Sequence, residues 1–170
     1  MVEIKEISIE DLAALQILGK QTFYETFAEH NTKEDINHYL DESFSSKKLQ
    51  KELKDPNSTF YFALIDGENA GYLKINIGNA QTELKDINAL EIERIYVLKK
   101  YLGQKVGQAL FEKASSLAKE GGYKYIWLGV WEENKRALAF YTKNGFVAFD
   151  KHIFRLGNDE QIDILMKLIL

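Results

Sequence analysis

The chain has 170 residues, which is enough for one domain with a buried core, and it has no cysteine. The lack of cysteine excludes disulfides, thiolate metal sites and a cysteine nucleophile. The formal net charge of −4, with no basic block, argues against nucleic acid as a partner, and no apolar run is long enough to span a membrane. The N-terminus lacks the shape of a signal peptide, so we expect a single domain over residues 1–170 in the cytoplasm.

The first third of the chain predicts one strand followed by helices. Val2 to Ile7 alternates apolar and charged residues, and a helix then begins at Ser8 or Ile9. Its apolar stripe includes Phe23 and Phe27, which we expect to pack on a sheet, whereas Tyr24 and Glu25 lie off the stripe and are candidates to line a substrate pocket. Residues 28–55 predict two short helices, capped by Thr32 and by Ser45 or Ser46, that form an insert over the substrate site or a lid on the core.

The remainder alternates predicted strands and helices, which indicates one mixed α/β sheet of about seven strands with flanking helices. A hairpin is predicted from the turn at residues 66–69, and residues 78–88 form a polar loop. The further elements expected are strands at 89–97, 123–130, 146–149, 152–156 and 162–170, and helices at 106–120 and 134–144.

The predicted strand at 89–97 carries carboxylates among apolar residues. On a period of two, Leu90, Ile92, Arg94 and Tyr96 share one face, and Glu91, Glu93, Ile95 and Val97 share the other. A carboxylate on a partly apolar face can have a raised pKa and act as a general base, which makes Glu93, and after it Glu91, a candidate. The alternative is that Glu93 forms an ion pair with Arg94 or with a lysine on the neighbouring strand.

The turn between this strand and the next helix contains Gly103 and Gly107 with lysines nearby. The first N–H groups of a helix have no internal partner, so such a turn suits a phosphate or pyrophosphate, although ordinary turn chemistry gives the same pattern. Other patterns are missing: the chain has no nucleophile elbow, no P-loop and no dinucleotide-binding glycine motif. Because His30, His38 and His152 lack metal-ligand spacing, we interpret them as surface residues and expect no metal.

Two segments, in this order, resemble the motifs of the GNAT superfamily of acetyl-CoA-dependent acetyltransferases. Residues 95–97 and 102–107 are similar to the family's CoA-binding motif, [QR]-x-x-G-x-[GA], except that Leu102 stands at the Gln/Arg position and Lys105 at the central glycine. Residues 134–146 match the second motif, N-x-x-A-x-x-x-Y-x-x-x-G-F, more closely. The resemblance covers essentially the whole chain and implies a mostly antiparallel sheet with a splayed central strand pair.

The resemblance also implies a role for each matching residue. Tyr141 would donate a proton to the departing thiolate, Glu93 would accept the amine proton, and Asn134, Arg136 and Ala137 would contact or make room for the CoA arm. The strand backbone would bind the pantetheine arm, and the turn would hold the pyrophosphate, through the residues Ile95, Tyr96, Val97, Gly103, Gln104, Lys105, Val106, Gly107 and Gln108.

The wider pattern, including residues 23–27 and 31–32, is similar to the PaiA-type spermidine and spermine N-acetyltransferases. This branch implies a small-molecule amine substrate that Tyr24, Glu25 and Glu91 would contact, with Glu29, Asp41 and Glu42 as further acidic candidates. Acetylation of a peptide, protein or amino-acid amine is an alternative, as is an acyl-CoA-binding regulatory module without catalysis. The sequence does not decide the oligomeric state and leaves a homodimer open.

Overall fold

The computed structural model describes all residues, 1–170, as one seven-stranded sheet with helices on both faces. Strands and helices follow each other along the chain as β1 (Val2–Glu6), α1 (Leu12–Phe27), α2 (Lys33–Ser43), α3 (Ser46–Lys54), β2 (Ser58–Ile65), β3 (Glu68–Asn76), β4 (Ala89–Val97), α4 (Val106–Glu120), β5 (Tyr125–Trp131), α5 (Lys135–Lys143), β6 (Val147–Leu156) and β7 (Asp159–Ile169).

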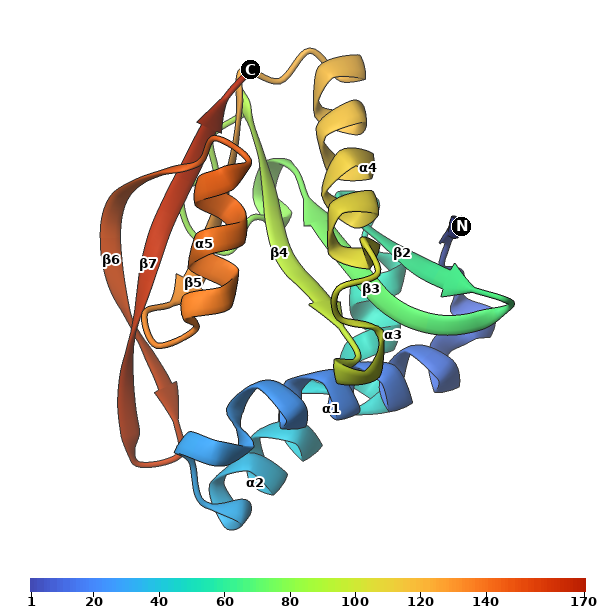
Figure 1. The fold of residues 1–170 in the computed structure, drawn as a ribbon, viewed down its shortest axis with the longest axis vertical. Coiled ribbons are helices and arrows are strands. Elements are labelled where there is room, and N and C mark those ends of the chain that lie inside the picture. The colour runs from blue at the N-terminus through green and yellow to red at the C-terminus, as the bar shows by residue number, and fades with distance from the viewer.

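The sheet is mixed and mostly antiparallel, as the resemblance implied, and its strand order is β1-β2-β3-β4-β5-β7-β6. Its one parallel pair, β4 and β5, is hydrogen-bonded over three residue pairs only, from Ala89 with Tyr125 to Glu91 with Trp127. Beyond Glu91 the two strands diverge toward α1 and α2, as Figure 1 shows. The β4 edge from residue 92 onward therefore has no strand partner on the β5 side, which confirms the splayed central pair.

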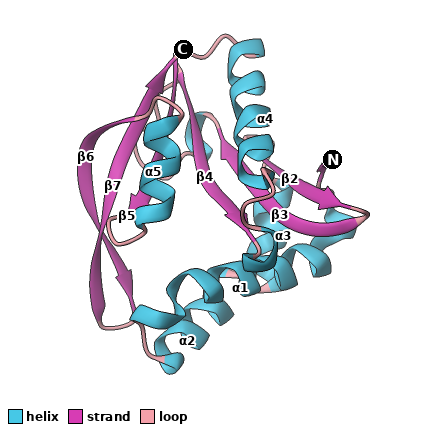
Figure 2. Cartoon of the chain, in the orientation of Figure 1, coloured by secondary structure: helices cyan, strands magenta, loops and turns pink.

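Helices cover the two faces of the sheet as two separate layers (Figure 2). One apolar core joins the sheet to α4 and α5 through residues such as Leu110 and Tyr141. The other joins the opposite face to α1, α2 and α3 through residues such as Leu15, Ile36 and Leu49. None of these helices combines the length and the hydrophobicity that a membrane span requires.

The pattern of alternating faces predicted for β4 is wrong beyond Ile92, because the strand contains a β-bulge. Lys74 of β3 faces Arg94 and Ile75 faces Ile92, so Glu93 is an extra residue without a partner. The extra residue reverses the alternation: Ile95 and Val97 join Leu90 and Ile92 in the α4 core, while Tyr96 packs in the α1–α3 core. Glu93 and Arg94 are consecutive in sequence, yet both reach the α1–α3 side.

The short helices of the insert begin where the sequence predicted. The Thr32 hydroxyl accepts a hydrogen bond from the backbone N–H of Asp35 at 3.1 Å, and the Ser45 hydroxyl accepts one from Lys48 at 3.2 Å. Near the C-terminus the structure differs from the expectation, because β6 continues through residues 150 and 151 across a register shift instead of breaking into two strands.

Candidate active site

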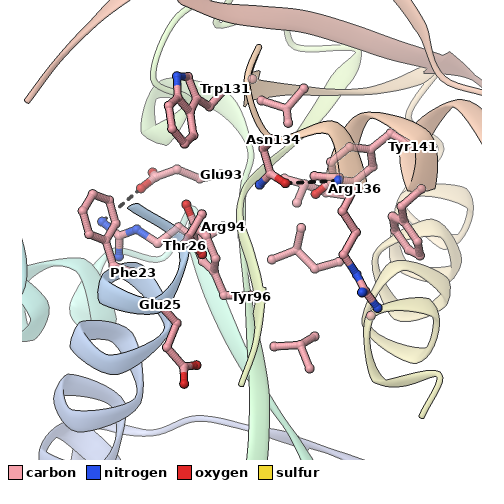
Figure 3. A pocket seen from close by; sticks show the side chains of 18 of the residues that line it. Phe23, Glu25, Thr26, Glu93, Arg94, Tyr96, Trp131, Asn134, Arg136 and Tyr141 are labelled. Atoms are coloured by element: carbon pink, nitrogen blue, oxygen red, sulfur yellow. Dashed lines mark hydrogen bonds and ion pairs between the residues drawn. The ribbon is translucent and has the colours of Figure 1, made fainter. Parts of the chain in front are cut away.

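A cavity of about 1050 Å³ runs through the opening between β4 and β5 and reaches both faces of the sheet. Figure 3 shows Tyr141 and Arg136 on one side of β4 and Phe23, Glu93 and Arg94 on the other. Most of the site residues predicted from the sequence line this cavity; the exceptions are Tyr24, Gln104 and the further acidic candidates Glu29, Asp41 and Glu42. The two motifs therefore meet in one place, although they lie about thirty residues apart in the sequence.

On the α4 side, the cavity is lined by the glycine-bearing turn. Lys105, at the position of the family's central glycine, has a left-handed backbone with φ of 63°, which explains why glycine is favoured there. The backbone N–H groups of Lys105 through Gln108 donate to no protein acceptor, and the first bonded amide of the helix is that of Ala109, to Lys105 at 3.1 Å. These free donors at the positive end of the helix dipole fit a pyrophosphate.

Cationic side chains surround the same turn. Lys99, Lys105, Arg136 and Lys143 all line the cavity. At Gly107 an added Cβ would lie 3.8 Å from Val97 and from Phe140, which is ordinary van der Waals contact, so the helix start approaches both side chains closely. Free amides, positive charge and an unpaired strand edge are the groups that the phosphates and the pantetheine arm of CoA require, so this face fits CoA.

Helix α5 brings two predicted residues to this side. The Asn134 Oδ1 atom accepts a hydrogen bond from the backbone N–H of Ala137 at 3.2 Å and so caps the helix, which leaves its Nδ2 free. Tyr141 is buried, its hydroxyl has no hydrogen-bond partner in the protein, and burial raises its pKa. The phenol consequently stays protonated at neutral pH and can donate a proton.

The α1–α3 side of the cavity is an aromatic chamber formed by Phe23, Phe27, Tyr39, Trp131 and Phe154. The rings are in contact: the centroids of Phe23 and Tyr39 are 4.5 Å apart, and those of Phe27 and Trp131 are 5.0 Å apart. Phe23 and Phe27 were expected to be core residues only, but they also form this wall. Aromatic faces attract alkylammonium groups, so the chamber suits an amine.

Beside the chamber lies a buried ion-pair network of Glu52, Lys74, Glu93 and Arg94. Glu93 accepts from Lys74 Nζ at 2.8 Å and lies 3.2 Å from Arg94 Nη2, while Glu52 pairs with Lys74 at 2.8 Å and with Arg94 at 3.2 Å. Burial alone would raise the pKa of Glu93, but Arg94 and Lys74 outweigh it and hold that pKa below its ordinary value. The expected raised pKa is therefore wrong, and the alternative of an ion pair with Arg94 and a neighbouring lysine is confirmed.

The pKa of Glu91 is shifted in the opposite direction to that of Glu93. It accepts hydrogen bonds from Asn76 Nδ2 at 3.0 Å and from the Thr82 backbone and hydroxyl at 2.8 and 2.6 Å, yet burial is the largest influence and raises its pKa. Thr82 belongs to the predicted polar loop, which folds back over this end of the cavity. Of the two candidate bases, Glu91 thus binds a proton more readily and Glu93 less readily than a free glutamate.

His152 and Asp163 were not predicted as site residues, yet both line the cavity. The Nε2 atom of His152 lies 3.3 Å from Asp163 Oδ2, and Nδ1 contacts the Glu83 carboxylate. The two residues face each other only because β6 and β7 pair in this register. No sequence spacing could have indicated the contact, and His152, which was interpreted as a surface residue, is 30% exposed and also lines the cavity.

The acidic residues expected from the insert do not reach the cavity. Asp41 pairs with Lys20 at 3.7 Å on the surface, and Glu42 lies 3.3 Å from His38 on its own helix. Glu29 and Tyr24 also lie outside the lining. Glu25 does line the cavity, but its carboxylate accepts the backbone N–H of Lys99 at 3.0 Å and ties α1 to the turn.

Comparison with known proteins places this geometry in a family. Residues 21–146 match the acetyltransferase (GNAT) family, which is well over half of the chain. The chain belongs to the GNAT family. An uncharacterised N-acetyltransferase from Lactobacillus delbrueckii subsp. lactis is 41% identical over 169 residues, covering 99% of this chain and 98% of that protein.

A sequence match and a structural match come from Thermoplasma acidophilum. Its spermidine N(1)-acetyltransferase is 29% identical over 153 residues, covering 88% of this chain and 90% of that protein. The crystal structure of its PaiA N-acetyltransferase in complex with coenzyme A superposes with a TM-score of 0.82 at 26% identity, covering 100% of this chain and 99% of the other. This GNAT chain is an acetyl-CoA-dependent N-acetyltransferase, which was the leading expectation from the sequence.

Proposed function

We propose that this GNAT enzyme acetylates a primary amine of a polyamine, with spermidine and spermine as the first candidates. The observation that supports this most is the cavity itself, which joins a CoA-suited face to an aromatic chamber through the opening between β4 and β5. Polyamines combine alkyl chains with ammonium groups, which suits aromatic walls with carboxylates beside them. The likeness to a spermidine N(1)-acetyltransferase adds support.

The amine must lose a proton before it can attack. An alkylammonium has a pKa of about 10.4, so deprotonation at pH 7 costs roughly 4.6 kcal/mol. We assign the proton-accepting role to Glu93, acting through water, because its carboxylate lines the cavity and is ionised at neutral pH. Its low pKa makes it a weak base, so the neutral amine must be supplied mainly by exchange with solvent. Glu91 is the second candidate.

Acetyl-CoA supplies the acetyl thioester. The neutral amine nitrogen forms a bond to the thioester carbonyl carbon, the carbon–sulfur bond breaks, and the sulfur leaves as a thiolate. In this proposal the Tyr141 hydroxyl gives its proton to that thiolate, and the proton lost by the amine nitrogen passes to Glu93 or water. Attack is direct, in a ternary complex, which accords with the absence of cysteine from the chain.

The test is release of CoA thiol from acetyl-CoA with a panel of amines: spermidine, spermine, putrescine, free lysine and short peptides. We expect kcat/KM for spermidine or spermine to exceed that for the peptides. Turnover of peptides alone would contradict the polyamine assignment while leaving the acetyltransferase activity in place. Turnover of none of the amines would contradict the proposed function as a whole.

A further inference from the structure

The cavity continues past the opening between β4 and β5 onto the neighbouring strand β7. At this point Gly129 of β5 is exposed, although Leu128 and Val130 on either side of it are buried. A Cβ added to Gly129 would lie 3.7 Å from Asp163 Oδ2 and 3.9 Å from His152. The nearest atom to such a Cβ would be Leu165 Cδ2 at 3.3 Å, so Gly129 lies between Leu165 and the Asp163 carboxylate, next to the opening where acetyl transfer is proposed.

Asp163 differs from the other carboxylates on this side of the cavity. Glu93 is neutralised within the ion-pair network, which contains two acidic and two basic side chains. Glu91 accepts three hydrogen bonds from Asn76 and Thr82. The Asp163 side chain is 18% exposed, its one partner is His152, and no protein group donates to its second oxygen, Oδ1.

A mostly buried carboxylate with too few partners destabilises the folded protein unless a cation pairs with it. Burial raises the pKa of Asp163, which is consistent with such a deficit. The adjoining walls are the rings of Trp131 and Phe154, so alkyl carbons can occupy the space between Asp163 and the opening. A ligand that joins an alkyl chain to an ammonium group satisfies both features.

We propose that Asp163, positioned by His152, binds the second ammonium group of a di- or polyamine whose first nitrogen is acetylated at the opening. This inference rests on the proposed function and adds a residue that determines specificity within the same cavity. Neighbouring strands are about 4.8 Å apart, and Asp163 lies on β7, one strand beyond the β5 side of the opening. A nitrogen at the opening and a second nitrogen at Asp163 are therefore separated by about three or four carbons. The predicted recognition element is thus the C-terminal hairpin, and not the helical insert.

The experiment compares butane-1,4-diamine with butylamine as acceptors, using wild-type protein, Asp163→Asn, and Asp41→Asn as a matched control. Asp41 loses the same charge on the surface, away from the cavity. We expect the wild type to prefer the diamine, and Asp163→Asn to lose about tenfold or more in kcat/KM for the diamine, the usual effect of removing a charged hydrogen bond. Its kcat/KM for butylamine and its CoA affinity should stay within about twofold of wild type.

Equal losses for both amines in Asp163→Asn would indicate a structural role and overturn the inference, as would an unchanged preference for the diamine. Should Asp163→Asn fail to fold, the wild type still decides with a series of diamines of increasing chain length. A maximum at about three or four carbons supports the inference, and a flat series contradicts it. No turnover of any amine by the wild type would instead contradict the proposed function itself.

Discussion

Tyr141 is the residue whose removal should separate catalysis from binding most cleanly. Its hydroxyl has no hydrogen-bond partner in the protein, so Tyr141→Phe breaks no internal hydrogen bond. If the phenol protonates the thiolate, kcat should fall by about a hundredfold or more, which is the usual contribution of a general acid. The steady-state rate of CoA thiol release at saturating substrates measures this change in kcat.

Two readouts serve as controls for Tyr141→Phe. The melting temperature and the CoA dissociation constant should match those of the wild type, because the ring still packs against Phe140 and Phe146. An unchanged kcat in a protein that binds CoA normally would remove Tyr141 from the mechanism.

Glu93 and Glu91 should affect stability in opposite directions as the pH changes. The folded-state pKa of Glu93 is lowered, so its contribution to stability is present above its ordinary value of 4.5 and is lost as the pH falls through the lower folded value. Glu91 has a raised pKa, so its contribution is present below 4.5 and is lost as the pH rises through the higher folded value.

Urea unfolding of Glu93→Gln and Glu91→Gln across the acidic range tests this contrast. Glu93→Gln should cost about 3–5 kcal/mol at neutral pH, because Lys74 and Arg94 lose a buried partner, and its deficit should shrink as the pH falls. The free energy of unfolding of Glu91→Gln, relative to that of the wild type, should be higher at neutral pH than at low pH. Parallel pH curves for the two variants would contradict the assigned electrostatics.

Substitutions of Lys105 separate the effect of backbone strain on stability from the effect of side-chain charge on CoA binding, at the left-handed position before α4. Lys105→Gly relieves the strain and Lys105→Ala keeps it, while both remove the charge. We expect the glycine variant to exceed the alanine variant by about 1 kcal/mol in free energy of unfolding. Both variants should bind CoA more weakly than the wild type, by similar factors. A more stable alanine variant would contradict the left-handed conformation.

Single residues were the level at which sequence reasoning was least complete. The positions of Tyr141 and Asn134 beside the cavity could be predicted, because the motif that contains them has helical spacing. The ion pair of Glu93 with Arg94 and a neighbouring lysine was one of two alternatives, and the sequence could not decide between them, because one bulge residue reverses the alternation of β4. His152 and Asp163 meet through strand register, which depends on the whole sheet.

At the scale of elements, β4 is held in place by a close approach to β3 at Gly71. A Cβ at Gly71 would lie 2.5 Å from the Tyr96 carbonyl oxygen and 3.2 Å from Val97 Cα, both of which are backbone atoms. Gly71→Ala must therefore displace the end of β4 that is expected to contact CoA. We expect a loss of about 1–3 kcal/mol in stability, as for other overpacked sites, and a raised KM for acetyl-CoA.

Gly107→Ala is the matched control, since its new Cβ would meet Val97 and Phe140 only at 3.8 Å. Thermal unfolding should show a normal melting temperature for Gly107→Ala and a lowered one for Gly71→Ala. Equal melting temperatures would contradict the close packing of β3 on β4.

Element boundaries were predicted well where a local signal exists. The helix caps at Thr32 and Ser45 and the start of α4 at Val106 depend on residues adjacent in sequence. The split of the C-terminal strand was wrong because the exposed, charged segment near Asp150 looks like a turn, whereas pairing with β7 keeps it extended. Long-range pairing of this kind leaves little trace in the local sequence.

For the whole molecule, periodicity predicted a mixed sheet, the splayed central strand pair came from the resemblance to the family, and the strand order came from the structure alone. The consequence of that opening is chemical. CoA is expected on the α4 and α5 face and the amine in the aromatic chamber, so the two substrates meet through the sheet without an intermediate bound to the protein.

The most direct test is the initial-rate pattern of CoA thiol release, measured with acetyl-CoA varied at several fixed concentrations of spermidine. Direct attack in a ternary complex predicts double-reciprocal lines that intersect. Parallel lines would mean that the acetyl group is first transferred to the protein and CoA leaves before the amine binds, which would contradict the meeting of both substrates across the sheet.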